Sequence, residues 1–142
     1  PTGGVDPVSR RNFWDCIYRL GADGTTIMVT THLMDEAEHC QQASLLSHGM
    51  LISKGTPQEM KDSIDGKLVK ITPHGRSPVL ALEDLKRSPI VYEDAYILGA
   101  SLHVIVHDDV DLAFLGQQET VTPTMDDVFV YYERKSHEKR TP

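Results

Sequence analysis

The stretch "TTIMVTTHLMDEAE", residues 25–38, decides how the chain is expected to fold. It opens with a run rich in β-branched residues and without polar alternation, which is typical of a strand buried on both faces of a parallel sheet. His32 follows this run, at the carboxyl end of the predicted strand, where ligands bind in open α/β sheets. Residues 31–40 then read as a short helix, with Asp35 and Glu36 in the first turn, where the helix dipole favours acidic side chains.

A second stretch, "PTGGVD" at residues 1–6, precedes another predicted helix. Asp6 is a good N-cap and Pro7 a good first helical residue. Gly3 and Gly4 let the backbone approach another surface closely. Both stretches therefore lie at turns that lead from the sheet into a helix. The helix that starts at Pro7 carries an apolar face made of Phe13, Trp14, Ile17 and Leu20.

The residues that follow predict small, regular elements. Residues 43–55 read as two short strands around a His48-Gly49 turn. Thr56 and Glu59 have the spacing of a capping box, with a proline at the first helical position. Asp65-Gly66 marks a predicted domain boundary, because the pattern of elements changes after it.

Residues 66–135 follow the order β-α-β-β-α-β, which predicts a ferredoxin-like α+β domain. Its second helix is expected over Asp109–Leu115. Thr124 is expected to cap a last helix, with Asp126 and Asp127 as charges in its first turn. Residues 136–142 are charged, and we expect a loose tail there.

Composition excludes several classes of protein. The chain has 142 residues, of which 39% are hydrophobic and 25% charged, as in ordinary globular domains. Its net charge of −7 disfavours nucleic acid as a partner, because neutralising phosphates requires a basic surface. Its two cysteines, Cys16 and Cys40, give no disulfide framework and indicate a reducing compartment.

Taken together, "PTGGVDPVSRRNFW" and "GTTIMVTTHLMDEAEHC" resemble the C-terminal half of an ABC transporter ATP-binding subunit of the exporter or multidrug type. Pro1 and Thr2 match the residues just after the Walker B Asp-Glu pair of that family. "PTMDDVF", residues 123–129, is similar to a motif in the C-terminal domain of such exporter subunits. The resemblance implies an α/β remnant of the P-loop NTPase (ABC) fold over residues 1–65, followed by the α+β domain over residues 66–135.

The resemblance also implies roles for particular residues. Gly3, Gly4, Val5 and Asp6 fall on the D-loop, which couples the two nucleotide sites of the family's head-to-tail dimer. His32 falls on the switch histidine, which contacts the γ-phosphate of ATP. The chain departs from the family in having Gly-Gly-Val where many members have Ser-Ala-Leu. It also has two glutamines, residues 41 and 42, where the family often has an Asp-Arg pair.

The implied parent protein is an ATPase that uses ATP and Mg²⁺. Its partners would be a membrane permease and a second nucleotide-binding subunit, with a homodimer expected, at the cytoplasmic face of the cell membrane. The 142 residues contain no GxxxxGK[ST] loop, no family signature and no Walker B carboxylates. We therefore expect this chain alone to be inactive and to bind neither a cofactor nor a metal.

Two alternatives remain open from the sequence. In the first alternative, the chain is a non-enzymatic ferredoxin-like module that regulates or binds a partner. In the second, His32, Asp35 or Glu36, and His39 share one helix face and hold a metal, although the His-Glu-x-x-His motif of zinc proteases is absent.

Overall fold

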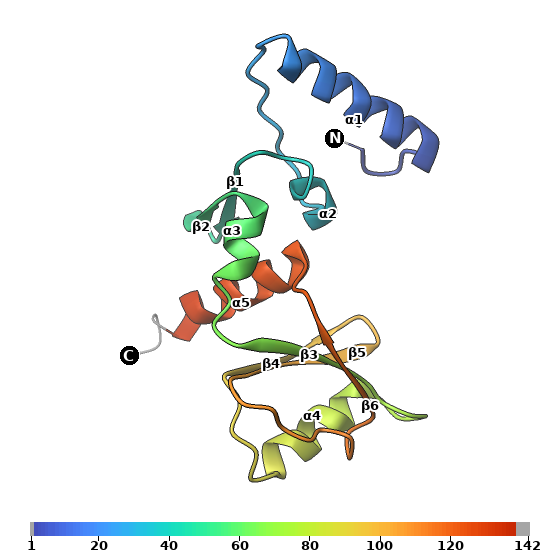
Figure 1. The fold of residues 1–142 in the computed structure, drawn as a ribbon, viewed down its shortest axis with the longest axis vertical. Coiled ribbons are helices and arrows are strands. Elements are labelled where there is room, and N and C mark those ends of the chain that lie inside the picture. Colours follow the sequence, from blue (N-terminus) through green and yellow to red (C-terminus); the bar gives the residue numbers. More distant parts are fainter. Residues whose placement is uncertain (1, 139–142) are drawn as a thin grey trace.

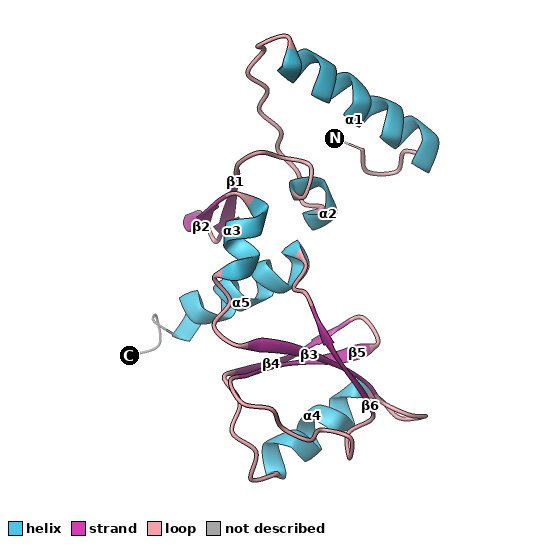
Figure 2. Ribbon diagram, in the orientation of Figure 1, coloured by secondary structure: helices cyan, strands magenta, loops and turns pink. Residues whose placement is uncertain are grey.

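The computed structural model describes residues 2–138, which form an elongated, mixed α/β structure (Figures 1 and 2). The helices are α1 (Pro7–Ala22), α2 (Met34–Ala37), α3 (Pro57–Asp62), α4 (Pro78–Arg87) and α5 (Met125–Glu138). The strands are β1 (Ala43–Ser47), β2 (Met50–Gly55), β3 (Lys67–Thr72), β4 (Asp94–Leu98), β5 (Ser101–Val106) and β6 (Gln117–Val121). Within the described residues, no helix is both long and apolar enough to span a membrane.

Helix α1 begins where the sequence predicts. The Asp6 carboxylate accepts hydrogen bonds from the backbone N–H groups of Val8 (3.0 Å) and Ser9 (3.1 Å). Pro7 occupies the first helical position, where its missing N–H would have had no helical partner. The bonds from Ser9 lower the pKa of the Asp6 carboxyl group, so the cap is charged at neutral pH.

The segment between α1 and α2 is not a strand, and the prediction of a buried strand over residues 25–30 is wrong. These residues are irregular and mostly exposed, with Met28 at 92% exposure. A strand needs a neighbour for its backbone hydrogen bonds, and within residues 2–138 no strand pairs with this segment. The helix predicted over residues 31–40 is also shorter, since α2 is a single turn.

Strands β1 and β2 form the predicted antiparallel hairpin. Its two turn residues, His48 and Gly49, have φ angles of 50° and 75°. Two positive φ angles in succession are what a two-residue type I′ turn requires. The turn therefore fixes the direction in which His48 leaves the hairpin.

The capping box predicted for α3 is confirmed. The Thr56 hydroxyl accepts a hydrogen bond from the Glu59 backbone N–H at 3.1 Å. The Glu59 carboxylate in turn accepts one from the Thr56 backbone N–H at 2.8 Å. Two N–H groups that the helix leaves unpaired are thus satisfied locally.

The second half of the chain is built on a four-stranded antiparallel sheet in the order β4-β5-β3-β6. Every residue of the central strand β5 is buried. Side chains alternate between the two faces, so Val104 packs in the cluster that contains α4 and Ile105 in the cluster that contains α5. The sheet accordingly lies between α4 on one face and α5 on the other (Figure 1).

The ferredoxin-like arrangement is not confirmed, because the helix predicted over Asp109–Leu115 does not form. Side chains there accept hydrogen bonds from the backbone N–H groups and so compete with a helix. The Asp111 carboxylate accepts one from Ala113, and the Gln118 side-chain oxygen accepts one from Leu112. The chain then closes on the sheet at Gly116, where a Cβ atom would lie 2.3 Å from the carbonyl oxygen of Thr72.

Helix α5 joins the two halves of the chain. Met125, Val128 and Tyr131 lie in one hydrophobic cluster with residues of the sheet and of the first half, among them Leu45 and Met60. The helix continues to Glu138, so residues 136–138 are helical and not part of a loose tail. The rest of the predicted tail, residues 139–142, lies outside the described residues.

Asp127, in the first turn of α5, is 1% exposed and accepts hydrogen bonds from three side chains. One carboxylate oxygen accepts from Tyr96 (2.9 Å) and from Nδ1 of His103 (2.6 Å), both on the sheet. The other accepts from the hydroxyl (2.7 Å) and backbone N–H (2.8 Å) of Thr124. From the sequence, Asp127 is predicted only as a charge in the first turn. In the structure it is the buried group that fixes α5 to the sheet.

Replacing Asp127 with alanine is expected to lower the free energy of unfolding by about 3 kcal/mol, because it leaves buried polar partners unsatisfied. The neighbouring Asp126 is exposed, so Asp126→Ala should cost less than about 1 kcal/mol. Urea unfolding of both variants at pH 7 checks this. Equal losses in the two variants would contradict the role assigned to Asp127.

The same group makes stability depend on pH. Burial alone raises the pKa of Asp127, but hydrogen bonds from His103 and Thr124 outweigh it and hold the pKa at about 2, below the usual 3.8. A lowered pKa in the folded state stabilises the fold above pH 3.8, and this contribution disappears as the pH falls toward 2. The difference in unfolding free energy between wild type and Asp127→Asn should therefore shrink over this range. A difference that stays constant from pH 6 to pH 2 would contradict it.

Candidate functional site

The predicted D-loop forms an exposed turn. The backbone N–H of Val5 donates to the carbonyl oxygen of Thr2 at 3.1 Å, and Gly4 has a φ of 77°, which favours glycine. Gly3, Gly4, Val5 and Asp6 are all exposed. A Cβ atom at either glycine would meet nothing within 4 Å. Within this chain the turn is therefore accessible, and the bare backbone at Gly3 and Gly4 faces open space.

The residue before this turn is anchored to α2. Thr2 donates two hydrogen bonds to one carboxylate oxygen of Glu36, from its backbone N–H at 3.0 Å and from its hydroxyl. Both residues are only 1% exposed. Burial raises the pKa of Glu36, but the bonds from Thr2 and Thr31 outweigh it and lower the pKa to about 2. An ionised, buried carboxylate thus joins two segments that lie 34 residues apart.

His32 is exposed and lies just before α2. The Thr31 hydroxyl accepts a hydrogen bond from the Leu33 backbone N–H at 3.0 Å, which orders the turn around His32. Among the described residues, no hydrogen bond or ion pair joins His32 to the turn at residues 3–6. Glu36 brings the two predicted stretches together, while the His32 imidazole itself faces solvent.

The residue that follows α2, Glu38, makes further contacts with distant parts of the chain. The Glu38 carboxylate pairs with Lys61 of α3 at 2.8 Å and accepts a hydrogen bond from the Met125 backbone N–H at 3.3 Å. Consecutive contacts therefore run from Thr2 through α2 to the first residue of α5. Sequence reasoning missed Glu36 and Glu38 as connecting residues, because their partners lie far away in the chain.

The apolar face of α1 is only partly covered. Trp14 is 4% exposed because His39 stacks on it, with ring centroids 4.6 Å apart. Tyr18 adds a hydrogen bond to His39 Nδ1 at 2.6 Å. Phe13 and Ile17 remain half-buried. Leu20, the last member of the face, is exposed, so Trp14 is the one residue of the face that is fully covered.

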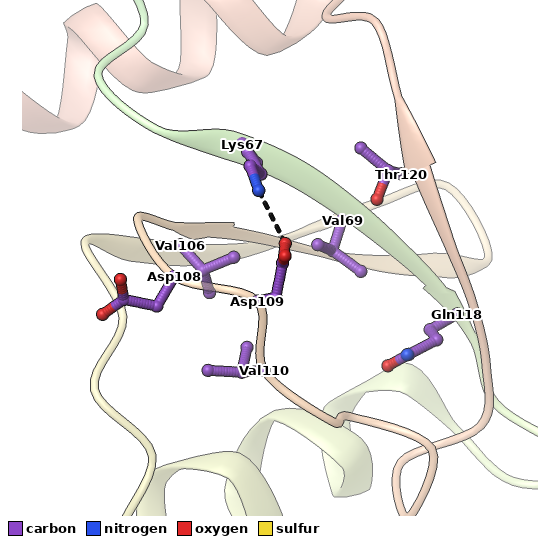
Figure 3. Close-up of a pocket in the computed structure, with 8 residues that line it drawn as sticks. All are labelled: Lys67, Val69, Val106, Asp108, Asp109, Val110, Gln118 and Thr120. Carbon is purple, nitrogen blue, oxygen red and sulfur yellow. Dashed lines mark hydrogen bonds and ion pairs between the residues drawn. The ribbon is translucent and has the colours of Figure 1, made fainter.

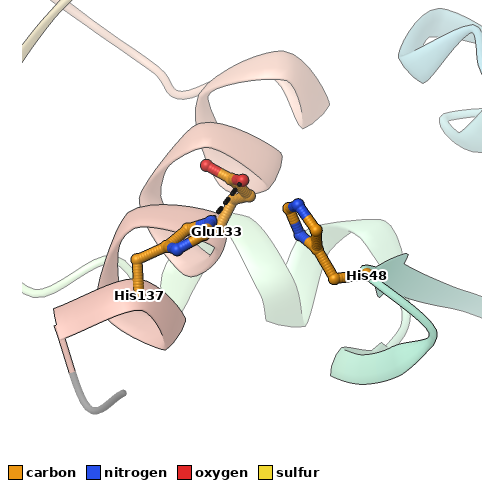
Figure 4. A group of neighbouring side chains, drawn as sticks. All are labelled: His48, Glu133 and His137. Atoms are coloured by element: carbon orange, nitrogen blue, oxygen red, sulfur yellow. Dashed lines mark hydrogen bonds and ion pairs between the residues drawn. The ribbon is translucent and has the colours of Figure 1, made fainter. Parts of the chain in front are cut away.

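Apart from His32, the potential ligands of the alternative metal site, which the sequence left open, are each engaged with a different partner. His39 packs against Trp14 and Tyr18, Asp35 pairs with Arg10 at 3.1 Å, and Glu36 binds Thr2. Within residues 2–138 the potential metal ligands that converge are instead His48, Glu133 and His137 (Figure 4).

An open pocket of about 280 Å³ lies beside β3, the end of β5 and the edge strand β6 (Figure 3). Its lining residues are Lys67, Val69, Val106, Asp108, Asp109, Val110, Gln118 and Thr120. The Lys67 ammonium group pairs with Asp109 at 2.6 Å, and both side chains are well exposed. The Lys67–Asp109 pair leaves Asp108 as a further negative charge in the lining. None of the lining residues belongs to the segments that carry His32 and the turn at residues 3–6.

No family model matches the sequence. It is similar to the probable multidrug ABC transporter ATP-binding protein YbhF of Escherichia coli, at 52% identity over 61 residues, which are 43% of this chain and 11% of that protein. It is also similar to the daunorubicin/doxorubicin resistance ATP-binding protein DrrA of Streptomyces peucetius, at 32% identity over 112 residues (78% and 30%). The Nod factor export ATP-binding protein I of Paraburkholderia xenovorans is 37% identical over 109 residues (76% and 34%).

The chain spans between about a tenth and a third of the length of these relatives. All three carry the words "ATP-binding protein" in their names. The chain is therefore homologous to part of the ATP-binding proteins of ABC transporters.

Proposed function

We propose that this chain works as the C-terminal part of the ATP-binding subunit of an ABC exporter. The observation that carries the proposal is its similarity to proteins named for multidrug transport, drug resistance and Nod factor export. In the whole subunit, ATP binding and hydrolysis at a head-to-tail dimer drive transport through a membrane permease. The subunit lies on the cytoplasmic face of the membrane, attached through that permease.

In this account His32 contacts the γ-phosphate and helps to hold the attacking water. Its imidazole is exposed, and the turn that carries it is ordered by the bond from Leu33 to Thr31, so it is available to a phosphate outside this chain. An imidazole nitrogen can donate a hydrogen bond to phosphate oxygen, and general acid–base groups of this kind contribute about 10²–10⁴-fold to rate.

Gly3, Gly4, Val5 and Asp6 form the D-loop in this account. Their exposure leaves the turn accessible to a second nucleotide-binding subunit. The Thr2–Glu36 link holds the start of the turn and the helix after His32 in one unit. A shift of the turn at the dimer interface is therefore transmitted to the segment that carries His32.

We infer that residues 2–138 do not hold Mg·ATP by themselves, because the sequence has no phosphate-binding glycine-rich loop. The group of potential metal ligands that converges among the described residues, His48, Glu133 and His137, does not include His32. We propose that ATP and Mg²⁺ are held by other parts of the parent subunit. Residues 66–135 then act as an accessory unit, coupled to the nucleotide site through α5 and Glu38.

The 142-residue chain is expected to bind no Mg·ATP in calorimetry and to release no phosphate. The physical reason is the lack of a cradle for the β- and γ-phosphates. Saturable binding or turnover by this chain would contradict the proposal. Turnover would indicate that the chain is a self-sufficient enzyme. Binding without turnover would favour the non-enzymatic regulatory module.

In an intact subunit that contains these residues, His32→Ala is expected to lower ATP turnover at least about 100-fold while nucleotide binding persists. His74→Ala is the matched control, since His74 is an exposed histidine in the loop before α4. Steady-state phosphate release and nucleotide binding would be measured on both variants. Turnover close to that of wild type in His32→Ala would rule out the assigned role.

A further inference from the structure

Three potential metal ligands from distant parts of the chain meet at one place (Figure 4). His48 comes from the turn of the β1–β2 hairpin, and Glu133 and His137 come from α5. One ligand atom from each residue lies within 4.8 Å of those of the other two. Nε2 of His137 is 3.0 Å from a carboxylate oxygen of Glu133, and the His48 ring meets the His137 ring edge-on, with centroids 5.1 Å apart.

The backbone fixes where each ligand starts. Glu133 and His137 are four residues apart on α5, so they lie on the same face of the helix. The helix is held by buried Val128 and Tyr131, which leaves little freedom for these two positions to move. His48 occupies a turn with a defined, left-handed backbone, so the histidine is presented by a rigid element.

A neighbouring hydroxyl orients the His48 ring. The Ser47 hydroxyl is hydrogen-bonded to Nδ1 of His48 at 2.9 Å, and Ser47 is only 9% exposed. A bond at Nδ1 leaves Nε2 as the nitrogen that can bind an ion. Metal-binding histidines almost always have such a partner on the other ring nitrogen, because it fixes the tautomer and the ring direction.

The cations next to Glu133 are engaged elsewhere. Arg134 pairs with Asp94 at 2.8 Å, and Lys135 pairs with Glu93 at 3.0 Å. Both acidic partners lie at the start of β4 or just before it. The negative charge of Glu133 is therefore directed toward the two histidines and not toward a neighbouring lysine or arginine.

We propose that His48, Glu133 and His137 form a binding site for a divalent transition metal ion of the zinc class. Two imidazoles and one carboxylate are a donor set that suits Zn²⁺, whereas Mg²⁺ and Ca²⁺ prefer oxygen ligands only. Bonds of about 2.0–2.2 Å in a tetrahedron place ligand atoms about 3.3–3.6 Å apart. Small rotations of the two exposed histidines and the half-buried Glu133 bring the three groups to that spacing, and water takes the fourth position.

Such an ion would connect the tip of the hairpin to the last turns of α5. It would add a link between the two halves of the chain, beside the hydrophobic cluster around α5, the contacts of Glu38 and the hydrogen bond between the Ser63 and Tyr132 hydroxyls. The inference is independent of the proposed transport function, because it needs only these three side chains and Ser47.

The test is a calorimetric titration of the 142-residue chain with Zn²⁺ at pH 7.5, after removal of metals with chelator. Cys16 and Cys40 are replaced by serine in every sample, because free thiols also bind zinc. We expect one equivalent of Zn²⁺ to bind. His48→Ala, Glu133→Gln and His137→Ala should each weaken binding by more than about tenfold, the lower end of the loss that even an outer-shell partner causes.

The control variant is His74→Ala, which removes an exposed histidine away from the site and should bind like the background protein. A second readout separates a true site from loose surface binding. Zn²⁺ should raise the unfolding temperature of the background protein but not of His48→Ala or His137→Ala, since an ion that binds only the folded state stabilises it. Absence of Zn²⁺ binding, or ligand variants that bind as tightly as His74→Ala, would overturn the proposal.

Discussion

The packing of α5 is the constraint on which the rest of the structure depends. Its apolar side, with Met125, Val128 and Tyr131, is buried between the sheet and the elements of the first half. Burying side chains of this size is worth about 1.5–3 kcal/mol each. Asp127 adds direction, because its carboxylate accepts bonds from Tyr96 and His103 of the sheet only when the helix has one orientation. The packing and the hydrogen bonds together fix the sheet and the elements of the first half to one helix.

The candidate site depends on this arrangement through α2. Glu38 holds α2 on the first residue of α5, and Glu36 on the other side holds Thr2 at the start of the glycine turn. The segments before α2 are open, since residues 25–30 are mostly exposed and a Cβ atom at Gly3 or Gly4 would meet nothing within 4 Å. In the proposed function, these open surfaces meet the other parts of the parent subunit and its dimer partner.

Local signals in the sequence predicted local structure well. The Asp6 cap, the His48-Gly49 turn and the capping box of Thr56 depend only on residues within a few positions of one another, and each is present. The buried strand over residues 25–30 was not found, because burial depends on neighbouring strands that a run of β-branched residues cannot supply. The helix over Asp109–Leu115 failed since side-chain acceptors compete for its N–H groups.

Long-range contacts were beyond sequence reasoning. No sequence pattern indicates that Thr2 contacts Glu36, or that His48 lies near Glu133 and His137. Only the fold brings these residues together. Asp127 looked like one of two equivalent first-turn charges, although only one of the pair is buried. For the candidate site, His32 and the glycine turn were recognised by resemblance to a family, and the buried carboxylate that joins them was not.

The most direct measurement of the central claim is the structure of an intact subunit that contains these residues, solved with Mg²⁺ and a slowly hydrolysed ATP analogue. The account predicts an imidazole nitrogen of His32 within about 3.2 Å of a γ-phosphate oxygen. A His32 ring that faces solvent while another side chain contacts the γ-phosphate would contradict the account.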